Sequence, residues 1–188
     1  MNEIAMRVLD MSTVLRPSNA YALVLEEIGV ARRKLALIIG AHEAHCIKIA
    51  RMAYKTPRPL TYEMVGNLLR QGDLKIKKAL IYDVSDGIYS SFIYVERPDG
   101  LEYRVDSRTT DAICLSYYMD FPVFVVEDLL DREMLRNISE DGSTYTLSVN
   151  SVSLDMLQKA MDDAVKAEDY ERASEIRDEI RRRKKEAE

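Results

Sequence analysis

The chain has little cysteine, proline or glycine and no tryptophan: its 188 residues include 2 Cys, 5 Pro and 7 Gly. So few glycines and prolines exclude collagen-like and low-complexity classes. Cys46 and Cys114 lie far apart among apolar neighbours, and two thiols cannot frame a disulfide-rich secreted fold. We therefore expect both to be reduced, buried thiols in a cytoplasmic protein.

Long apolar runs and an excess of basic charge are also missing. No run approaches the roughly 18 apolar residues that cross a bilayer, and the start Met1-Asn2-Glu3 lacks the basic region of a signal peptide. We expect no membrane partner. Because 27 Lys and Arg stand against 32 Asp and Glu, for a net charge of -5, any contact with nucleic acid must come from a local patch.

The chain does have enough apolar residues for a core, together with an uneven distribution of charge. Hydrophobic residues make up 47% and charged residues 31% of the sequence, yet residues 154–188 alone carry 9 Lys or Arg and 11 Asp or Glu. The polar stretch from Asn137 to Tyr145, which contains Gly142, is typical of a linker. We predict three parts: an α+β domain over 1–136, a linker over 137–152 and a helical hairpin over 153–188.

Apolar periodicity in the first part changes repeatedly between that of strands and that of helices. Runs rich in β-formers and bounded by turn residues predict strands over 6–11, 20–26, 34–39, 74–84, 88–96, 101–105 and 122–126. Helical spacing predicts helices over 41–54, 61–72, 108–119 and 127–135. Strands and helices are mixed without strict alternation, so we expect the α+β class, with a mixed or antiparallel sheet and packed helices.

The charged tail has the periodicity of two short amphipathic helices, one apolar stripe on each, interrupted at residues 167–169. Such an αα-hairpin buries little surface by itself, so its stripes should seek a protein partner. The residues that we predict to bind this partner are Leu157, Met161, Tyr170, Ala173, Ile176 and Ile180.

The densest polar cluster, Val105-Asp106-Ser107-Arg108-Thr109-Thr110-Asp111-Ala112, lies where a predicted strand opens into a helix. A helix N-terminus attracts anions, and a guanidinium donates to phosphate oxygens, so Arg108 and Thr110 are candidates for binding phosphate. Asp106 and Asp111 could hold a divalent cation or position an attacking water, as phosphodiester hydrolysis requires. The alternative is structural: Asp and Thr are ordinary capping residues, and Arg108 can pair with a neighbouring carboxylate.

Two further segments carry candidate residues. In Gly40-Ala41-His42-Glu43-Ala44-His45, Glu43 falls in the first turn of a helix, and the two histidines are spaced i, i+3 rather than as in a zinc-binding HExxH helix. We favour solvated histidines, with Glu43 complementing the helix dipole. In the second segment two prolines stiffen the loop around Arg58, which suits either phosphate recognition or a structural clamp on the helix of Asp111.

Taken in order, three segments make residues 4–135 resemble the bifunctional nuclease domain family. They are Ile38-Ile39-Gly40 followed by Glu43-Ala44, then Arg58-Pro59-Leu60-Thr61, and Val105 to Ile113. The family usually reads Asp-Ala-Arg-Pro-Ser-Asp-Ala-Ile in the last segment; Asp106, Arg108 and Asp111 match, while Ser107, Thr109 and Thr110 replace its Ala, Pro and Ser. After Thr61 the family has His-Asp, where this chain has Tyr62-Glu63.

The resemblance implies a compact α+β domain, a homo-oligomer, and the nuclease activity on DNA and RNA that is reported for some members. The tail separately resembles the UVR motif, the helical hairpin of the excision-repair proteins UvrB and UvrC. The matching residues include Leu157, Ala160, Ala164, Glu168-Asp169-Tyr170-Glu171, Ala173, Ile176 and Ile180. In that family the hairpin binds a second copy or a partner's hairpin and carries no catalysis.

Two hypotheses follow. In the first, the chain is a nuclease that uses Mg²⁺ or Mn²⁺: Glu43, Asp106 and Asp111 are catalytic, with the metal on Asp106 and Asp111. The residues that bind substrate are then Arg58, Arg108 and Thr110, and the guanidinium groups and acids must converge on one water-accessible hollow. In the alternative, the protein is a non-enzymatic interaction or regulatory protein, and these charges form a buried network of ion pairs.

Overall fold

The computed structural model describes residues 2–12, 20–137, 145–146, 154–166 and 168–186. The main domain contains the strands β1 (Glu3–Met11), β2 (Tyr21–Glu27), β3 (Lys34–Ile39), β4 (Lys75–Ser85), β5 (Ile88–Glu96), β6 (Glu102–Arg108) and β7 (Val123–Val126). Its helices are α1 (Ala41–Arg51), α2 (Thr61–Gln71), α3 (Thr109–Met119) and α4 (Glu127–Glu133). Two short strands, β8 (Arg136–Asn137) and β9 (Tyr145–Thr146), pair with each other.

The seven long strands form one mixed sheet in the order β3-β2-β1-β7-β4-β5-β6. All neighbours are antiparallel except β4 and β7, which are parallel. The turn between β4 and β5 contains Asp86 and Gly87, both with positive φ (49° and 73°), as a tight hairpin turn requires. The fold is therefore α+β with a mixed sheet, as the sequence predicts.

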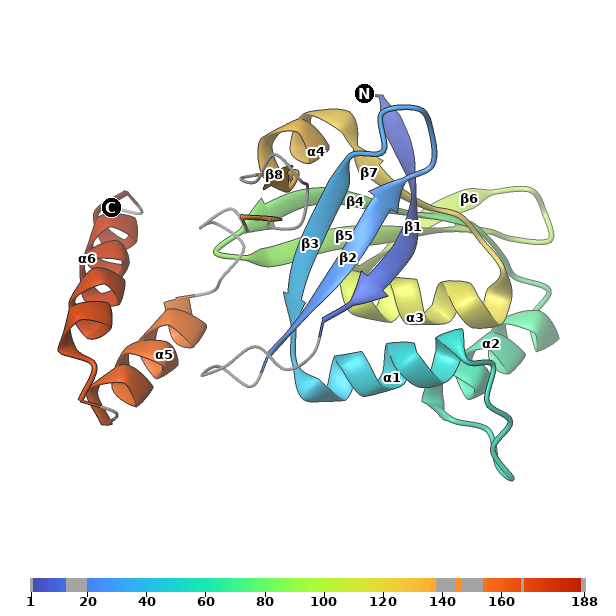
Figure 1. Ribbon diagram of the computed structural model, residues 1–188. Helices are drawn as coiled ribbons and strands as arrows, with labels where there is room; N and C mark the ends of the chain where they lie inside the picture. Colours follow the sequence, from blue (N-terminus) through green and yellow to red (C-terminus); the bar gives the residue numbers. More distant parts are fainter. Residues whose placement is uncertain (1, 13–19, 138–144, 147–153, 167, 187–188) are drawn as a thin grey trace.

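Helices α1, α2 and α3 lie together on one side of the sheet, and α4 lies near the far ends of the strands (Figure 1). The layer between sheet and helices is apolar: Ile47 of α1 and Ile113 of α3 are fully buried against Leu23, Leu25 and Ile81 of the sheet. The apolar positions that recur every three or four residues in α1 and α3 face this core, which fixes the faces that these helices turn outward.

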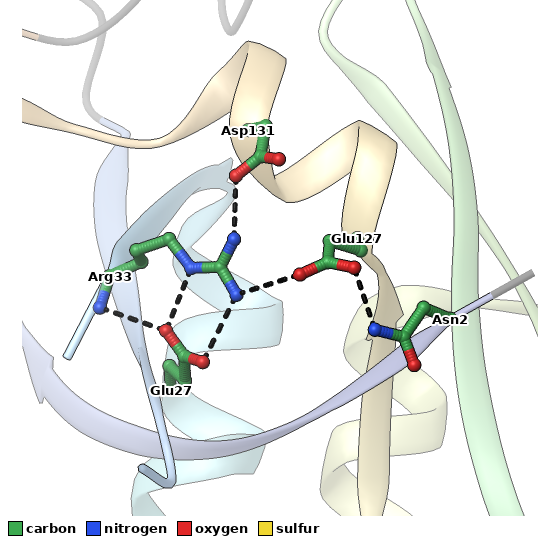
Figure 2. Close-up of polar contacts among 5 residues, drawn as sticks. All are labelled: Asn2, Glu27, Arg33, Glu127 and Asp131. Atoms are coloured by element: carbon green, nitrogen blue, oxygen red, sulfur yellow. Dashed lines mark hydrogen bonds and ion pairs between the residues drawn. The ribbon is translucent and has the colours of Figure 1, made fainter. Parts of the chain in front are cut away.

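A network of charges fastens the β2–β3 turn to α4 (Figure 2). Arg33 donates from Nε and Nη2 to the two carboxylate oxygens of Glu27 (2.8 and 3.0 Å), and from Nη1 to Asp131 Oδ1 (2.6 Å). Its Nη2 also lies 3.5 Å from Glu127 Oε1, and Glu127 accepts a hydrogen bond from Asn2 Nδ2. The carboxylate of Glu27 is buried, and Arg33 holds its pKa below the usual value. This network joins the β2–β3 turn to α4 and involves none of the residues singled out as site candidates in the sequence.

The C-terminal hairpin consists of α5 (Leu154–Lys166) and α6 (Tyr170–Glu186), which pack on each other. Of the residues predicted to bind a partner, Ala173 and Ile180 are buried, and Leu157, Met161 and Ile176 are half-buried. Tyr170 is 67% exposed. No helix in the described parts of the chain is long and apolar enough to span a membrane.

Most predicted elements begin and end within three residues of the observed ones, and two differences affect the site. Strand β6 continues to Arg108, because its ladder with β5 runs through to the pair Ser90 and Arg108, and α3 begins at Thr109. Helix α1 ends at Arg51, and Ala53 then adopts a positive φ of 48°. Most of the predicted linker, 137–152, lies outside the described residues; within it, Asn137 pairs with Tyr145.

Candidate functional site

Two strand-to-helix junctions bring the candidate residues to neighbouring clefts. Strand β3 ends at Ile39, and Gly40 caps α1 with an extended backbone; Arg108 does the same for α3. The second junction is anchored to β5, since the buried Thr109 donates a hydrogen bond from Oγ1 to the carbonyl oxygen of Tyr89 (3.0 Å). In each helix the first turn lacks intrahelical partners for its N–H groups, so each junction offers donors and a partial positive charge.

The first cleft, of about 360 Å³, lies between the two junctions. Glu43, Arg108 and Thr110 line it, together with Gly40 and the exposed Ile88. Arg108 Nη1 lies 3.9 Å from Glu43 Oε1, and the Arg108 side chain is 78% exposed. This contact is too long for a hydrogen bond, and an exposed pair of this kind contributes little stability. The guanidinium is therefore accessible to an anionic ligand.

The position of the Glu43 carboxylate requires a residue without a Cβ atom at position 40. A Cβ atom built on Gly40 would lie 2.5 Å from Glu43 Oε2, closer than real Cβ contacts. The carboxylate thus folds back over the N-terminus of its own helix, where the helix dipole favours negative charge. A side chain at position 40 would displace it.

The second cleft is larger, about 580 Å³, and lies between α1, α2, α3 and β6. Its polar lining includes Asp106 of β6, Asp111 of α3 and three residues of α1, namely His42, His45 and Cys46; the other polar lining residues are Thr61, Tyr62 and Ser107. Its apolar lining consists of Ile49, Leu60, Val65, Ile93, Val105, Leu115 and Tyr118. Side chains alternate along a strand, and Val105 pairs with the buried Ile93 on the helix side of the sheet, whereas Asp106 pairs with Phe92. The Asp106 side chain therefore leaves β6 on the face opposite to Val105, and Asp106 borders this cleft only at the edge of the sheet.

Asp111 is oriented by α2. The hydroxyl of Tyr62, in the first turn of α2, donates a hydrogen bond of 2.8 Å to Asp111 Oδ1. Burial raises the pKa of Tyr62 well above its usual value, and the neighbouring Asp111 carboxylate raises it further. The phenol therefore stays protonated, and remains a donor, throughout the neutral and mildly alkaline range. Within the described residues no hydrogen bond engages Asp111 Oδ2, so this oxygen is available for another contact.

Cys46 lies beside His42, with its Sγ 3.6 Å from His42 Nε2. Burial raises the pKa of the Cys46 thiol, and the carboxylates of Glu43 and Asp111 raise it further. A thiol whose pKa is raised is a poor nucleophile, because the thiolate is the reactive form. Of the α1 side chains in this cleft, the exposed histidines are the better candidates for moving protons.

The structure divides the predicted site residues between the two clefts. Glu43, Arg108 and Thr110 line the first, and Asp106 and Asp111 line the second. The sixth residue, Arg58, is exposed in the loop between α1 and α2 and is not among the residues lining either cleft. The predicted single hollow is therefore two adjoining clefts that share the N-terminal turns of α1 and α3.

The sequence analysis did not select His42, His45 or Tyr62 as candidate site residues. A signal for the histidines was present, since i, i+3 spacing places two side chains on one face of a helix. Within the described segments, no group of three or more His, Cys, Asp or Glu side chains is arranged to hold a metal ion. Any metal at Asp106 and Asp111 would need ligands from water or substrate to complete its shell.

Comparisons with known proteins find relatives of this chain and two family models that match it. Two uncharacterized proteins of Mycobacterium tuberculosis, one from strain CDC 1551 / Oshkosh and one from strain ATCC 25618 / H37Rv, are each 24% identical to this chain over 157 residues. The matches cover 84% of this chain and 92% of each relative. A model of the UvrB/uvrC motif matches residues 152–186, which include α5 and α6. A model of the bifunctional nuclease domain matches residues 14–137, about two thirds of the chain and both clefts, and the protein therefore belongs to the bifunctional nuclease domain family.

Proposed function

We propose that this protein hydrolyses phosphodiester bonds in DNA or RNA at the two adjoining clefts. The observation that carries the proposal is their pairing: a cleft with an exposed guanidinium and two helix N-termini adjoins one that holds the Asp111 carboxylate and two histidines and has Asp106 at its edge. Charge stabilisation of phosphate oxygens and activation of a water are the two requirements of this reaction. Membership of the bifunctional nuclease domain family supports the same assignment.

The first cleft suits a phosphate group. Arg108 is free to form charge-assisted hydrogen bonds, because it is exposed and its contact with Glu43 is long. The first-turn N–H groups of α3, around Thr110, add donors that favour an anion. In this arrangement Glu43 limits the affinity of Arg108 for phosphate, which assists release of product.

The second cleft suits the remainder of a nucleotide and the attacking water. Its apolar lining, including Ile49, Leu115 and Tyr118, can pack against a base or sugar. Asp111, oriented by Tyr62, can position a water, and His42 or His45 can take up or supply the proton. Neither histidine is buried, so both can exchange protons with solvent.

Asp106 and Asp111 fit the ligand set of Mg²⁺ or Mn²⁺. Magnesium sites in enzymes often use only one or two carboxylates and complete the shell with water and substrate phosphates. In this proposal Asp111, which has one oxygen not engaged by Tyr62, is the carboxylate inside the cleft, and Asp106 adds a second carboxylate at its edge. When bound, such an ion supplies positive charge to the phosphate and lowers the pKa of a coordinated water.

The exposure of the charges favours catalysis over the alternative of a structural ion-pair network. The alternative requires that Arg58 and Arg108 be buried and paired with acids, but both are exposed. The network that does tie elements together is centred on Arg33, elsewhere in the fold. The net charge of -5 argues for the alternative, because a general nuclease profits from a positive field. We therefore expect weak, salt-sensitive binding of substrate.

A metal-dependent cleavage assay on the purified full chain tests this function. We expect cleavage of single-stranded DNA or RNA with Mg²⁺ or Mn²⁺, and a fall of about 100-fold in kcat for Asp111→Asn and for Asp106→Asn. Asp128→Asn is the matched control: it makes the same change at an exposed position in the first turn of α4. Absence of cleavage with both metals, or equal rates in all variants, would refute the proposal.

The C-terminal hairpin contributes binding rather than chemistry in this proposal. Tyr170 is exposed on α6 and Val165 on α5, so apolar surface remains after the two helices have packed. We assign this surface to a protein partner, either a second copy of the hairpin or another protein with a UVR motif.

A further inference from the structure

The end of α1 and the loop that joins it to α2 carry cations and no acids. Residues 44–62 include Lys48, Arg51, Lys55 and Arg58 but no Asp or Glu, in a chain whose net charge is -5. No other stretch of the sequence runs so far without an acid. Because the whole chain is acidic, contact with nucleic acid has to come from a local patch of this kind. These four cations are named the basic rim below.

The cations of the basic rim are exposed and have no acid partner. All four residues are exposed, and within the part of the chain that the structure describes none of them forms an ion pair. The exposed Arg7, Arg32 and Arg97, by contrast, each pair with a carboxylate. Arg51 donates one hydrogen bond, from Nη2 to the carbonyl oxygen of Leu9 (3.2 Å). An exposed cation without an acid partner is available to an anion from outside the chain.

The basic rim borders the larger of the two clefts. Ile49 and Leu60 both line that cleft, and the segment between them leaves the cleft wall and returns to it. Lys48 immediately precedes Ile49, and Arg58 lies two residues before Leu60. A polymer bound in the cleft extends past its border, and on the side of α1 and the following loop this border is basic.

The loop holds its cations on a defined backbone. Ala53, just after the end of α1, adopts a positive φ of 48°. The hydroxyl of Thr56 donates a hydrogen bond to the carbonyl oxygen of Arg58. The rings of Pro57 and Pro59 fix two further φ angles. Cations on a stiff loop lose less conformational entropy on binding a polyanion than cations on a flexible one.

A structural role accounts for only part of this charge. Lys48 and Arg51 lie in the last turn of α1, where cations complement the helix dipole. Lys55 and Arg58 lie beyond the end of the helix, so the dipole does not account for them. Arg51 also lines a third cavity, of about 400 Å³, together with Asp120, which offsets part of its charge. The cations most available to a ligand are therefore the other three.

We propose that the basic rim binds the phosphate backbone of a single-stranded nucleic acid, next to the nucleotide held in the larger cleft. The inference rests on the proposed function, because this strand is the substrate of that reaction. A base can enter the cleft between α1, α2 and α3 only when it is not paired, so the strand is single. Arg58, which lines neither cleft, thus binds substrate outside both of them.

The salt dependence of binding tests this proposal. Each contact between a cation and a phosphate of a single strand contributes about 0.7 to the slope of log Kd against log[NaCl]. We expect Lys48→Ala/Lys55→Ala/Arg58→Ala to lower this slope by about 2 and to weaken binding about tenfold or more at low salt. The probe is a fluorescent oligothymidylate of about 15 nucleotides, and its anisotropy is measured with the full chain in the absence of metal, so that no cleavage takes place.

Two variants serve as controls. Lys75→Ala removes an exposed lysine at the start of β4, outside both clefts, and should leave the slope unchanged. Lys55→Arg keeps the charge of the basic rim and should keep the slope. All substituted positions are exposed, and circular dichroism checks that each variant folds. A purely structural role for the three cations would lower the thermal midpoint of the triple variant without changing the slope.

Binding and cleavage separate the two proposals. A slope that the triple variant leaves unchanged, an equal loss in Lys75→Ala, or absence of binding by the wild-type chain would each overturn the basic rim. Cleavage by the wild type together with an unchanged slope in the triple variant would keep the proposed function and discard the rim. A reduced slope in the triple variant of a chain that cleaves nothing would refute hydrolysis and support the rim as a binding surface.

Discussion

The hydroxyl of Tyr62 donates a hydrogen bond to Asp111 over 2.8 Å and so joins the first turns of α2 and α3. These two helices come from segments nearly fifty residues apart in the chain, and the bond sets the direction of the one acid that lies both at a helix N-terminus and inside the larger cleft. Asp111 is half-buried, so its carboxylate loses part of its hydration on folding, and an oxygen without a hydrogen bond would leave that loss uncompensated. Tyr62 is thus a positioning residue in the proposed reaction.

Tyr62→Phe should lower kcat for nucleic-acid cleavage about tenfold and leave KM nearly unchanged, because the loss of one hydrogen bond to a charged group corresponds to about 1.5 kcal/mol. Steady-state kinetics on a single-stranded substrate measure both constants. Tyr54→Phe is the matched control, since Tyr54 is exposed and lines neither cleft. An unchanged kcat would show that the bond between Tyr62 and Asp111 serves only to hold α2 against α3.

Gly40→Ala should reproduce the effect of Glu43→Gln on activity, because an added Cβ cannot coexist with the present place of Glu43 Oε2. The clash involves the end of a flexible side chain, so the thermal midpoint should change little. Gly29→Ala is the control: its Cβ would meet Glu27 Oε1 at 3.6 Å, an ordinary contact. Wild-type activity in Gly40→Ala together with a loss in Glu43→Gln would show that the carboxylate works equally well elsewhere in the cleft.

The order of elements and the strand-to-helix junctions could be predicted because they depend on local pattern. The change of apolar period at Gly40, and the turn at Asp86 and Gly87, are properties of adjacent residues. The insertion of β7 between β1 and β4 could not be read in this way. It is a pairing between distant segments, and a short apolar run such as Val123 to Val126 does not encode its neighbours.

The limits of the site prediction have a similar cause. Asp106 and Asp111 stood out because they are close together in the sequence, and the structure places both at one cleft. Tyr62 stood out only as a departure from the family's histidine, and its part in orienting Asp111 depends on how α2 packs on α3. Arg58 was selected from a rigid loop, but rigidity does not determine the direction in which a loop presents its side chain.

Arg33→Ala should destabilise the domain by about 2 kcal/mol, because it leaves the buried Glu27 carboxylate without its cation and separates the β2–β3 turn from α4. Urea unfolding at neutral pH measures this loss. Arg97→Ala removes the exposed pair with Asp99 and should cost less than about 0.5 kcal/mol. The stabilisation by Arg33 should also weaken in acid. Folding lowers the pKa of Glu27, so the ion pair stabilises the fold above the pKa that Glu27 has in the unfolded chain, and this stabilisation is lost as pH falls through the pKa of Glu27 in the folded protein.

In the hairpin, Ile180→Asp should expose residues 154–186 to proteolysis, whereas Tyr170→Asp should not. Ile180 is buried, and placing a carboxylate there breaks the packing of α5 on α6. Tyr170 is exposed, so the same substitution leaves the packing intact. Limited proteolysis of the full chain, followed by mass spectrometry, compares the two. Equal cleavage in both variants would indicate that the two helices do not depend on each other.

The last prediction concerns alkaline pH. Complete burial raises the pKa of Cys114 from 9.0 to about 12, so the folded protein keeps the thiol protonated where the unfolded chain ionises it. Because folding raises this pKa, the buried thiol contributes its full stabilisation of the fold below pH 9, and that stabilisation is lost as pH rises toward 12. Cys114→Ala should cost on the order of 1 kcal/mol at neutral pH for the lost packing. Urea midpoints of the two proteins should then converge as pH rises from 8 and cross before pH 11, since only the wild type loses the thiol's contribution, by about 1.4 kcal/mol per pH unit above pH 9. A constant difference over that range would mean that Cys114 ionises as readily in the folded protein as in the unfolded chain.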